Sequence, residues 1–254
     1  MLFGSGFILN RAEAKSLGLG YSAEAREVIR EYRNGRDLTQ TQRGVLVIDL
    51  FGLQIDEVKY KFPKIYQWLI ERVKPERDQN RDRSIRENWW LHGRTRPEWR
   101  DYASGLKRYI ATVETTKHRI FQFLDADILP DNMLVNIAID QPDCLGVLSS
   151  RVHAAWALVA GGRLGMGNDA RYNKSRCFET FPFPILDDQQ SAKIGDLAQK
   201  IDDHRKARQM EHSDLTLTGM YNVLEKIRAE EPLTAKDKTI HEQGIVCKRS
   251  NNHI

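Results

Sequence analysis

The sequence RYIATV at residues 108–113 is followed by RIFQFL at 119–124 and by MLVNIAI at 133–139. All three segments are short and rich in β-branched and aromatic residues, a composition typical of β-strands. Polar turn residues separate them. The middle of the chain is therefore predicted to consist largely of strands.

Helical and extended patterns alternate on the N-terminal side of these strands. Residues 22–32 are predicted to form a helix with Ser22 as its N-cap. An apolar run bounded by glycines predicts a buried strand within residues 44–51. Residues 56–74 repeat apolar side chains at helical spacing, and Pro63 is compatible with a first helical turn there. This half of the chain is thus predicted to be mixed α/β.

The pattern becomes helical beyond the central strands. Apolar side chains along one face predict a helix over 145–160. A Gly-, Arg- and Asn-rich segment at 161–184 is predicted to be an irregular loop, and it ends in Phe181-Pro182-Phe183-Pro184. The prolines force extended geometry on the phenylalanines before them. We expect Phe181 and Phe183 to be core anchors.

The C-terminal part is predicted to be all helical. One helix carries an apolar stripe at i, i+3, i+4 and i+7, formed by Ile194, Leu197, Ala198 and Ile201. Another begins at Thr234, with Asp237 in a capping-box position. The overall prediction is an α+β fold, with a mixed α/β domain over residues 1–186 and a small helical segment over 187–254.

Composition narrows the class of protein. The chain has 254 residues, 41% hydrophobic and 29% charged, which is typical of a soluble globular protein. No apolar run is long enough for a transmembrane helix, so we expect no membrane association. The three cysteines are far apart in sequence and form no disulfide framework or CxxC pair, which favours a cytoplasmic location.

Positive charge is concentrated in one block of the sequence. The net charge is only +4, but residues 71–119 hold 13 basic and 8 acidic side chains. Four of the five tryptophans lie in or beside this block: Trp68, Trp89, Trp90 and Trp99. Cations interleaved with aromatic rings suit a polyanion surface. The alternative is an ion-paired helical region around a tryptophan core, and composition alone favours that alternative.

Catalytic motifs are incomplete. Phe3-Gly4-Ser5-Gly6 is similar to a turn that holds S-adenosylmethionine, but the parallel strand that such a turn must follow is missing. The histidines and cysteines show no zinc-site spacing, and no P-loop or GxSxG motif occurs. We therefore predict no catalytic residues, no metal site and no cofactor on this chain.

Several motifs together resemble one family. They are Tyr32-Arg33-Asn34-Gly35, Arg86-Glu87-Asn88-Trp89-Trp90, Leu145-Gly146-Val147-Leu148-Ser149-Ser150-Arg151, Gly162-Arg163-Leu164 and Phe181-Pro182-Phe183-Pro184. In this order and spacing they resemble the C-terminal half of MmeI-like adenine-N6 DNA methyltransferases of restriction-modification systems. The resemblance covers roughly residues 1–245. It implies a DNA target-recognition domain over 1–186 and the start of a helical C-terminal region.

The resemblance also implies a division of labour. The chain is expected to read a sequence in double-stranded DNA, while a methyltransferase domain or subunit elsewhere binds S-adenosylmethionine. Two alternatives stay open. One is that the chain itself acts as an S-adenosylmethionine-dependent DNA methyltransferase, and the other is that it is a truncated, inactive gene product.

Base readers need hydrogen-bonding groups that match base edges, such as Arg or Lys for guanine and Glu or Asp for cytosine. By position, the resemblance points to Glu114, Asn132 and the segment 165–169. The turn at 112–119 and the loop at 163–171 also offer suitable side chains. The predicted base readers are Glu114, Lys117, Asn132, Asn168, Asp169 and Arg171.

Phosphate contacts place a protein on the duplex. The predicted phosphate ligands come from the basic block and are Arg77, Arg81, Arg83, Arg86, Arg94, Arg96, Lys107 and Arg108. The alternative is that nearby acids pair with these cations at helical spacing, among them Glu76, Asp78, Asp82 and Glu87. The two interpretations are equally weighted for any single arginine.

Overall fold

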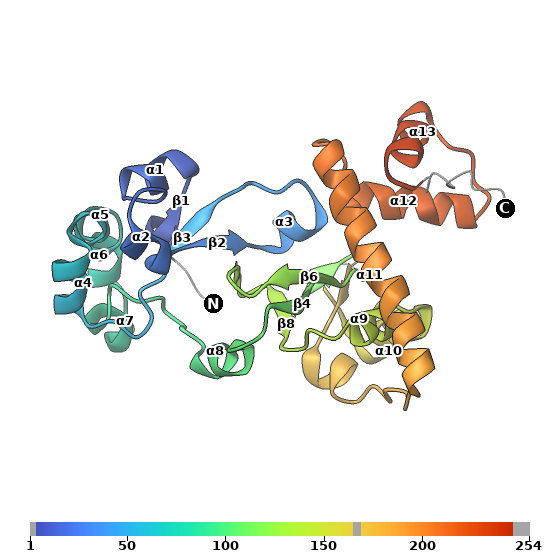
Figure 1. The fold of residues 1–254 in the computed structure, drawn as a ribbon, viewed down its shortest axis with the longest axis horizontal. Coiled ribbons are helices and arrows are strands. Elements are labelled where there is room, and N and C mark those ends of the chain that lie inside the picture. Colours follow the sequence, from blue (N-terminus) through green and yellow to red (C-terminus); the bar gives the residue numbers. More distant parts are fainter. Residues whose placement is uncertain (1–3, 165–168, 246–254) are drawn as a thin grey trace. The chain divides into compact units, whose positions relative to one another are not determined.

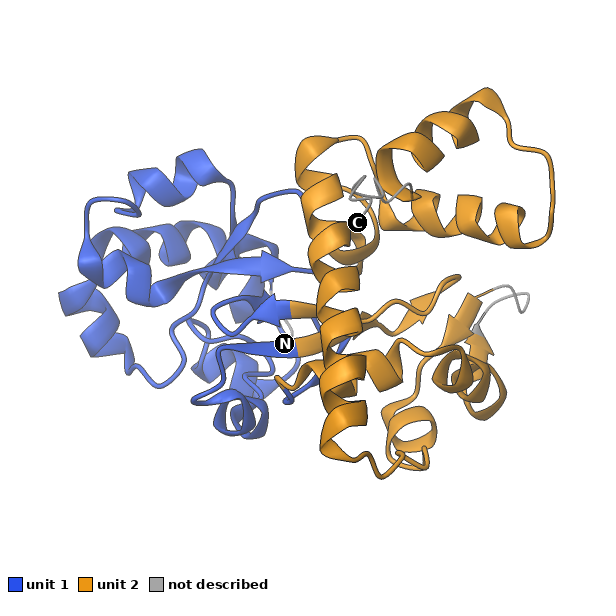
Figure 2. Ribbon diagram, turned by 45° about the vertical axis from the view of Figure 1, so that its right-hand side comes forward, with its two compact units in different colours: residues 1–34, 43–109, 124–139 blue, residues 35–42, 110–123, 140–254 orange. Residues whose placement is uncertain are grey.

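The computed structural model describes residues 4–164 and 169–245. Figure 1 shows many helices together with short strands, and this mixture confirms the predicted α+β fold. The chain forms two compact units, coloured separately in Figure 2. Unit 1 comprises residues 1–34, 43–109 and 124–139, and unit 2 comprises residues 35–42, 110–123 and 140–254. The boundary predicted at residue 186 divides the sequence into two continuous segments, whereas each of these units combines several segments. That boundary therefore stays a prediction.

Unit 1 contains a sheet with the strand order β1-β3-β2-β7. Strands β1 (Ile8–Leu9) and β2 (Ile29–Arg33) pair antiparallel to β3 (Leu46–Ile48), and β7 (Leu129–Pro130) pairs parallel to β2. All of β3 is buried, which confirms the strand predicted within 44–51.

Strand β2 corrects part of the predicted helix over 22–32. Helix α2 (Ala23–Val28) begins as predicted, because Ser22 accepts a hydrogen bond from the backbone of Ala25. The helix ends where Ile29 pairs with Ile48 of β3. Pairing with a distant strand therefore overrides the local helical pattern at this point.

Short helices and turns make up most of the rest of unit 1. The predicted helix over 56–74 is two helices, because Pro63 starts a new helix after Phe62. Trp89 and Trp90 are buried in the core of this unit, and Trp68 and Trp99 pack against that core. The helical elements are η1 (Ser5–Phe7), α1 (Arg11–Ser16), α2, α4 (Ile55–Lys61), α5 (Pro63–Arg72), α6 (Lys74–Asp78), α7 (Arg83–Glu87) and α8 (Pro97–Ala103).

The three central strands were predicted correctly as strands. They are β4 (Arg108–Val113), β6 (Gln122–Asp125) and β8 (Leu134–Ile137), in the sheet order β6-β4-β8. Strand β4 has the predicted bounds, whereas β6 begins three residues after the predicted start. The chain passes from one unit to the other within β4 and again within β6.

Unit 2 is mainly helical. The predicted helix over 145–160 is interrupted, because one helix ends at Leu148 with Ser149 as its C-cap. Ser150 then caps the next helix by accepting a hydrogen bond from His153 N at 3.1 Å. The capping box of Thr234 and Asp237 is present as predicted. The helical elements are α3 (Gly35–Thr39), α9 (Pro142–Leu148), α10 (Arg151–Ala160), η2 (Lys174–Phe178), α11 (Asp188–Glu211), α12 (Leu217–Arg228), α13 (Ala235–Ile240) and η3 (His241–Ile245).

Helix α11 packs along α9, as Figure 1 shows. A glycine permits the close approach, since a Cβ placed at Gly146 would lie 2.5 Å from Ile194 Cγ2 and 3.3 Å from Ala198 Cβ. The predicted stripe is therefore only half covered. Leu197 and Ile201 stay 52% and 46% exposed. Within the described residues, no helix has both the length and the apolar composition that a membrane crossing requires.

The C-terminal helices are held to the rest of unit 2 by buried polar contacts. Asp202 on α11 accepts a hydrogen bond from Phe123 N at 3.3 Å, and Arg205 donates to Phe121 O at 3.0 Å. Ile120 shares a small core with α12 residues Leu217 and Met220. The helical segment after residue 187 thus packs on residues 120–123, which belong to the predicted target-recognition domain.

Candidate nucleic-acid interface

A small sheet in unit 2 joins two segments that are distant in sequence. Strand β10 (Asp169–Arg171) pairs antiparallel with β9 (Gly162–Leu164) on one side and with β5 (Thr115–Thr116) on the other. The segment 161–184 was predicted to be irregular, so this pairing is a correction. Its consequence is that the two predicted base-reading segments lie side by side.

Two predicted base readers make a direct ion pair at this sheet. Nε of Arg171 donates to Oε1 of Glu114 at 2.6 Å, and the same carboxylate oxygen lies 2.6 Å from the Nη2 atom. Tyr172 N donates to Glu114 O at 2.7 Å, which fixes the backbone on which the carboxylate stands. The side chains remain 22% and 47% exposed for Glu114 and Arg171, so both can reach solvent or a ligand.

Lys117 stands on the turn that follows β5. Its ammonium donates to Asn222 Oδ1 at 2.8 Å and lies 3.0 Å from a Glu225 carboxylate oxygen. The neighbouring His118 contacts the same Asn222 oxygen at 2.8 Å. Helix α12 therefore holds this turn, and Lys117 has a carboxylate partner in the protein.

Arg119 joins β10 to the strand and turn that precede β5, and the sequence analysis did not identify it as a site residue. Its guanidinium donates to Thr112 Oγ1 at 3.2 Å, to the carbonyls of Val113 and Glu114, and to Ala170 O at 3.0 Å. It also lies 4.9 Å from the centre of the Tyr172 ring. Burial lowers the pKa of Arg119 to about 10, so the group stays charged at neutral pH. One side chain thus ties β4, the Glu114 turn and β10 together.

Tyr172, which contacts Arg119, belongs to an aromatic cluster with His153 and Phe181. Nδ1 of His153 is 2.9 Å from Leu148 O, so it carries the proton, and Nε2 accepts from the Tyr172 hydroxyl at 3.1 Å. Burial lowers the pKa of His153, which keeps the ring neutral. Phe181 packs edge-on against His153 at 4.6 Å and is buried, as predicted. Phe183 is 38% exposed, so the prediction that it is a core anchor is wrong.

For the other predicted base readers, the structure gives only the exposure and the unit to which each belongs. Asp169 is exposed at the start of β10. Asn132 is exposed in the turn between β7 and β8, in unit 1 rather than in unit 2. Asn168 lies outside the described residues. The structure therefore brings together Glu114, Lys117, Asp169 and Arg171 in one unit and leaves Asn132 in the other.

The predicted phosphate ligands all belong to unit 1 and differ in exposure. Arg77 is only 5% exposed, its Nε atom has no hydrogen-bond partner, and burial lowers its pKa. Its guanidinium lies 5.5 Å from the centre of the Phe7 ring. Arg77 therefore faces the core, and its expected role as a phosphate ligand is withdrawn.

The remaining cations reach the surface to different degrees. Arg83 pairs with Glu87 at 2.7 Å, and Arg86 donates to Asn80 O at 2.6 Å. Arg83 thus follows the alternative, in which an acid at helical spacing pairs with the cation, whereas Arg86 is held by a backbone carbonyl that precedes its helix. The exposed cations of the set are Arg81, Arg83, Arg94, Arg96 and Lys107, while Arg86 and Arg108 are half-buried.

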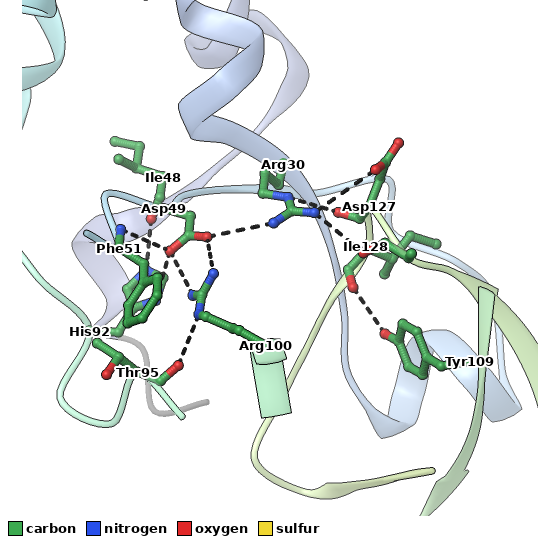
Figure 3. Close-up of polar contacts among 11 residues, drawn as sticks. Arg30, Ile48, Asp49, Phe51, His92, Thr95, Arg100, Tyr109, Asp127 and Ile128 are labelled. Atoms are coloured by element: carbon green, nitrogen blue, oxygen red, sulfur yellow. Dashed lines mark hydrogen bonds and ion pairs between the residues drawn. The ribbon is translucent and has the colours of Figure 1, made fainter. Parts of the chain in front are cut away.

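A buried ion pair holds the segment that carries Arg94 and Arg96 (Figure 3). Arg100 donates from both terminal nitrogens to the two oxygens of Asp49 at 2.8 Å, and Arg30 lies 3.8 Å from the same carboxylate. His92 Nε2 lies 2.7 Å from Ile48 O, and burial lowers the pKa of His92 to about 4. This network ties the segment before β4 to β3, and nothing in the local pattern predicted it.

Gly6, in the segment that is similar to an S-adenosylmethionine turn, packs closely against α5. A Cβ at Gly6 would lie 2.4 Å from Arg72 O, and Trp68 Nε1 donates to Gly6 O at 2.9 Å. The missing side chain at Gly6 therefore serves packing against α5. Among the described residues, no three His, Cys, Asp or Glu side chains are grouped as metal ligands.

Comparisons of the sequence with known proteins found a matching family model and a curated relative. A family model described as "MmeI, target recognition domain" matches residues 2–185. DNA methyltransferase A of Bacillus subtilis (strain 168) is 33% identical over 97 residues, which are 38% of this chain and 10% of that protein.

A solved structure has a similar fold. It is described as the Type IIL restriction-modification enzyme MmeI in complex with DNA. The TM-score is 0.67 at 20% identity, with 94% of this chain and 30% of that chain covered. The chain thus spans less than a third of the length of either of these two proteins.

Proposed function

The chain belongs to the MmeI target recognition domain family, and from this premise we propose that it is the sequence-reading module of a restriction-modification adenine-N6 DNA methyltransferase. It binds double-stranded DNA and reads base edges. A methyltransferase domain, on the same or another chain, binds S-adenosylmethionine and transfers the methyl group.

The Glu114–Arg171 pair carries this proposal. An arginine can donate two hydrogen bonds to guanine, and a carboxylate can accept from the amino group of cytosine. The β5–β10 pairing presents these two side chains together, and Asp169 is exposed on the same strand as Arg171. A donor and an acceptor fixed side by side can distinguish a G·C pair from its reversed orientation.

The pair also explains how recognition can be selective. Without DNA, each charge is satisfied by the other at 2.6 Å. A duplex must replace that interaction with hydrogen bonds of the same quality. A base pair with the wrong pattern leaves a charged group unpaired, which costs about 1–3 kcal/mol.

The exposed cations of unit 1 supply a second, sequence-independent contribution. Arg81, Arg94, Arg96 and Lys107 make no side-chain ion pair among the described residues. Each cation that neutralises a phosphate releases counterions and makes binding salt-dependent. We propose these four as the phosphate ligands that remain from the predicted set.

Binding of the whole chain to fluorescent duplexes tests the proposal. Fluorescence anisotropy is measured from about 50 to 200 mM salt, with a duplex library as the probe and single-stranded DNA as the control. We expect the logarithm of the duplex association constant to fall linearly with the logarithm of the salt concentration. Absence of salt-dependent duplex binding, alone and with a cognate methyltransferase domain, contradicts the proposal.

Calorimetry separates this function from methyl transfer by the chain itself. Titration with S-adenosylmethionine is expected to produce no binding heat, because Gly6 packs against α5. Saturable binding together with methylation of DNA by the isolated chain overturns the division of labour.

A further inference from the structure

A pocket of about 450 Å³ opens in unit 2 beside the recognition sheet. Its wall includes Ala170 of β10 and Lys117 of the turn after β5, so it adjoins the strands that carry Arg171 and Glu114. The corner between α9 and α10 forms a second wall, and helices α11 and α12 form the others.

The pocket is strongly basic. Among the described residues that line it, five carry positive charge and Glu225 is the one acid. The five cations are Lys117, Arg119, Arg151, Arg205 and Arg228. An excess of positive charge in a concave surface concentrates anions there.

Three of the five cations have partners in the protein. Lys117 pairs with Glu225, Arg119 donates to backbone carbonyls, and Arg205 donates to Phe121 O and to the Tyr221 hydroxyl. These contacts hold the walls together, and they account for the hydrogen bonds of the three groups.

Two arginines and one hydroxyl are left over. Arg151 and Arg228 are exposed and make no side-chain hydrogen bond or ion pair within the described part of the chain. Oγ of Ser149 is buried and has no hydrogen-bond partner. A buried hydroxyl without a partner costs free energy unless a ligand or water supplies one. The pocket therefore holds donors from both α10 and α12 that the protein does not use.

The N-terminus of α10 adds to the positive electrostatic potential of the pocket. Ser150 caps this ten-residue helix, and Arg151 is its first residue. The first turn of a helix presents free N–H groups and partial positive charge, which favour an anion. Apolar side chains complete the lining, among them Leu158, Ile201 and Leu224. Such a lining suits a phosphate ester with a carbon body better than a bare inorganic ion.

We propose that this pocket binds a phosphate ester, with Arg151 and Arg228 as its charged ligands. The position of the pocket beside β10 favours a backbone phosphate of the duplex as this phosphate ester, an assignment that rests on the proposed function. A free nucleotide carries the same chemical group, and the experiment below distinguishes it from the duplex.

The test uses the full chain and the double variant Arg151→Gln with Arg228→Gln. Both positions are exposed and unpartnered, so the melting temperature is expected to stay unchanged. The matched control is Lys193→Gln with Lys236→Gln, which removes the same charge from exposed positions of unit 2 outside the pocket.

The first arm measures duplex affinity against salt concentration. If the pocket variant neutralises one phosphate fewer, its salt slope is expected to fall by about 0.9, with a smaller change in the control. The second arm titrates wild type and both variants with deoxyadenosine 5′-monophosphate, using deoxyadenosine as the probe without phosphate. Binding of the monophosphate that only the pocket variant loses assigns the site to a free phosphate ester.

The outcomes distinguish the two proposals. If wild type binds duplex but the pocket variant and the control behave alike in both arms, the pocket proposal is overturned and the recognition function stands. If wild type binds no duplex but binds the monophosphate through the two arginines, the recognition function fails and the pocket proposal stands.

Discussion

The guanidinium of Arg171 lies 2.6 Å from the carboxylate of Glu114, a residue 57 positions earlier in the chain. The relationship depends on register, because Arg171 is paired with Thr115 across the β5–β10 ladder. A shift by one residue would turn the Arg171 side chain to the opposite face of the sheet. We therefore expect groups that hold this register to affect recognition as strongly as the groups that are proposed to touch DNA.

Arg119→Lys tests that dependence. An ammonium cannot reach Thr112 Oγ1 and the carbonyls of Val113, Glu114 and Ala170 together, so several part-buried acceptors lose their donor. We expect the free energy of unfolding to fall by about 2–4 kcal/mol in urea denaturation. At temperatures where the variant is folded, we also expect weaker discrimination between duplexes with little change in salt slope.

Arg176→Lys is the matched control for Arg119→Lys. Arg176 is exposed, lies in the same unit, and makes no side-chain hydrogen bond or ion pair within the described residues. If Arg119→Lys lowers stability but leaves discrimination equal to that of the control, the positioning role of Arg119 is wrong.

The ion pair between Asp49 and Arg100 is predicted to stabilise unit 1. The two side chains are only 5% and 14% exposed, so removal of one leaves the other charged and poorly solvated. Asp49→Asn is expected to lower the free energy of unfolding by about 3–5 kcal/mol. Arg83→Gln breaks the exposed pair with Glu87 and is expected to change it by less than about 1 kcal/mol. Equal effects in denaturant titrations refute this ranking.

His92 predicts a pH dependence of stability. Its pKa is about 4 in the folded protein and near 6.5 when unfolded. Between these values the unfolded state binds a proton that the folded state does not, so stability rises with pH across this window. At pH 5 the folded state is expected to lose about 2 kcal/mol relative to pH 7.5 from this group.

His92→Gln isolates that contribution. A glutamine amide can still donate to Ile48 O, but it does not titrate. Denaturation of both proteins at pH 7.5 and pH 5 is therefore expected to show a smaller loss for the variant. An identical loss in the two proteins assigns the pH dependence to other groups.

Exposure separates the arginines of the basic block into two classes. Replacement of Arg81, Arg94 and Arg96 by glutamine is expected to lower the salt slope of duplex binding by about 0.9 for each phosphate that is no longer neutralised. Arg77→Met removes a buried cation whose Nε has no partner, so we expect an unchanged slope and nearly unchanged stability. A slope lowered by Arg77→Met but not by the triple variant reverses this assignment.

Local signals in the sequence were reliable where local physics decides the structure. Ser22 and Thr234 cap helices as predicted, and the β-branched run at 108–113 is β4. Errors occurred where distant segments decide. Ile29 leaves the predicted helix because it pairs with Ile48.

The candidate site shows the same limit. Its residues Glu114, Lys117 and Arg171 could be proposed from side-chain chemistry and from the family resemblance. Arg119 could not, because its role consists of hydrogen bonds to backbone carbonyls that only the folded strands bring together. Likewise, the sequence shows that Arg77 is basic but not that it is buried.

Selection from a random duplex library tests the central claim most directly. Wild type and Arg171→Ala are each incubated with the library, and the bound duplexes are sequenced. We predict an enriched motif for wild type and the loss of preference at one base pair for the variant, with the other positions retained. No enriched motif for the wild-type chain in the presence of its methyltransferase domain, or an identical motif for both proteins, contradicts the claim that Arg171 reads DNA sequence.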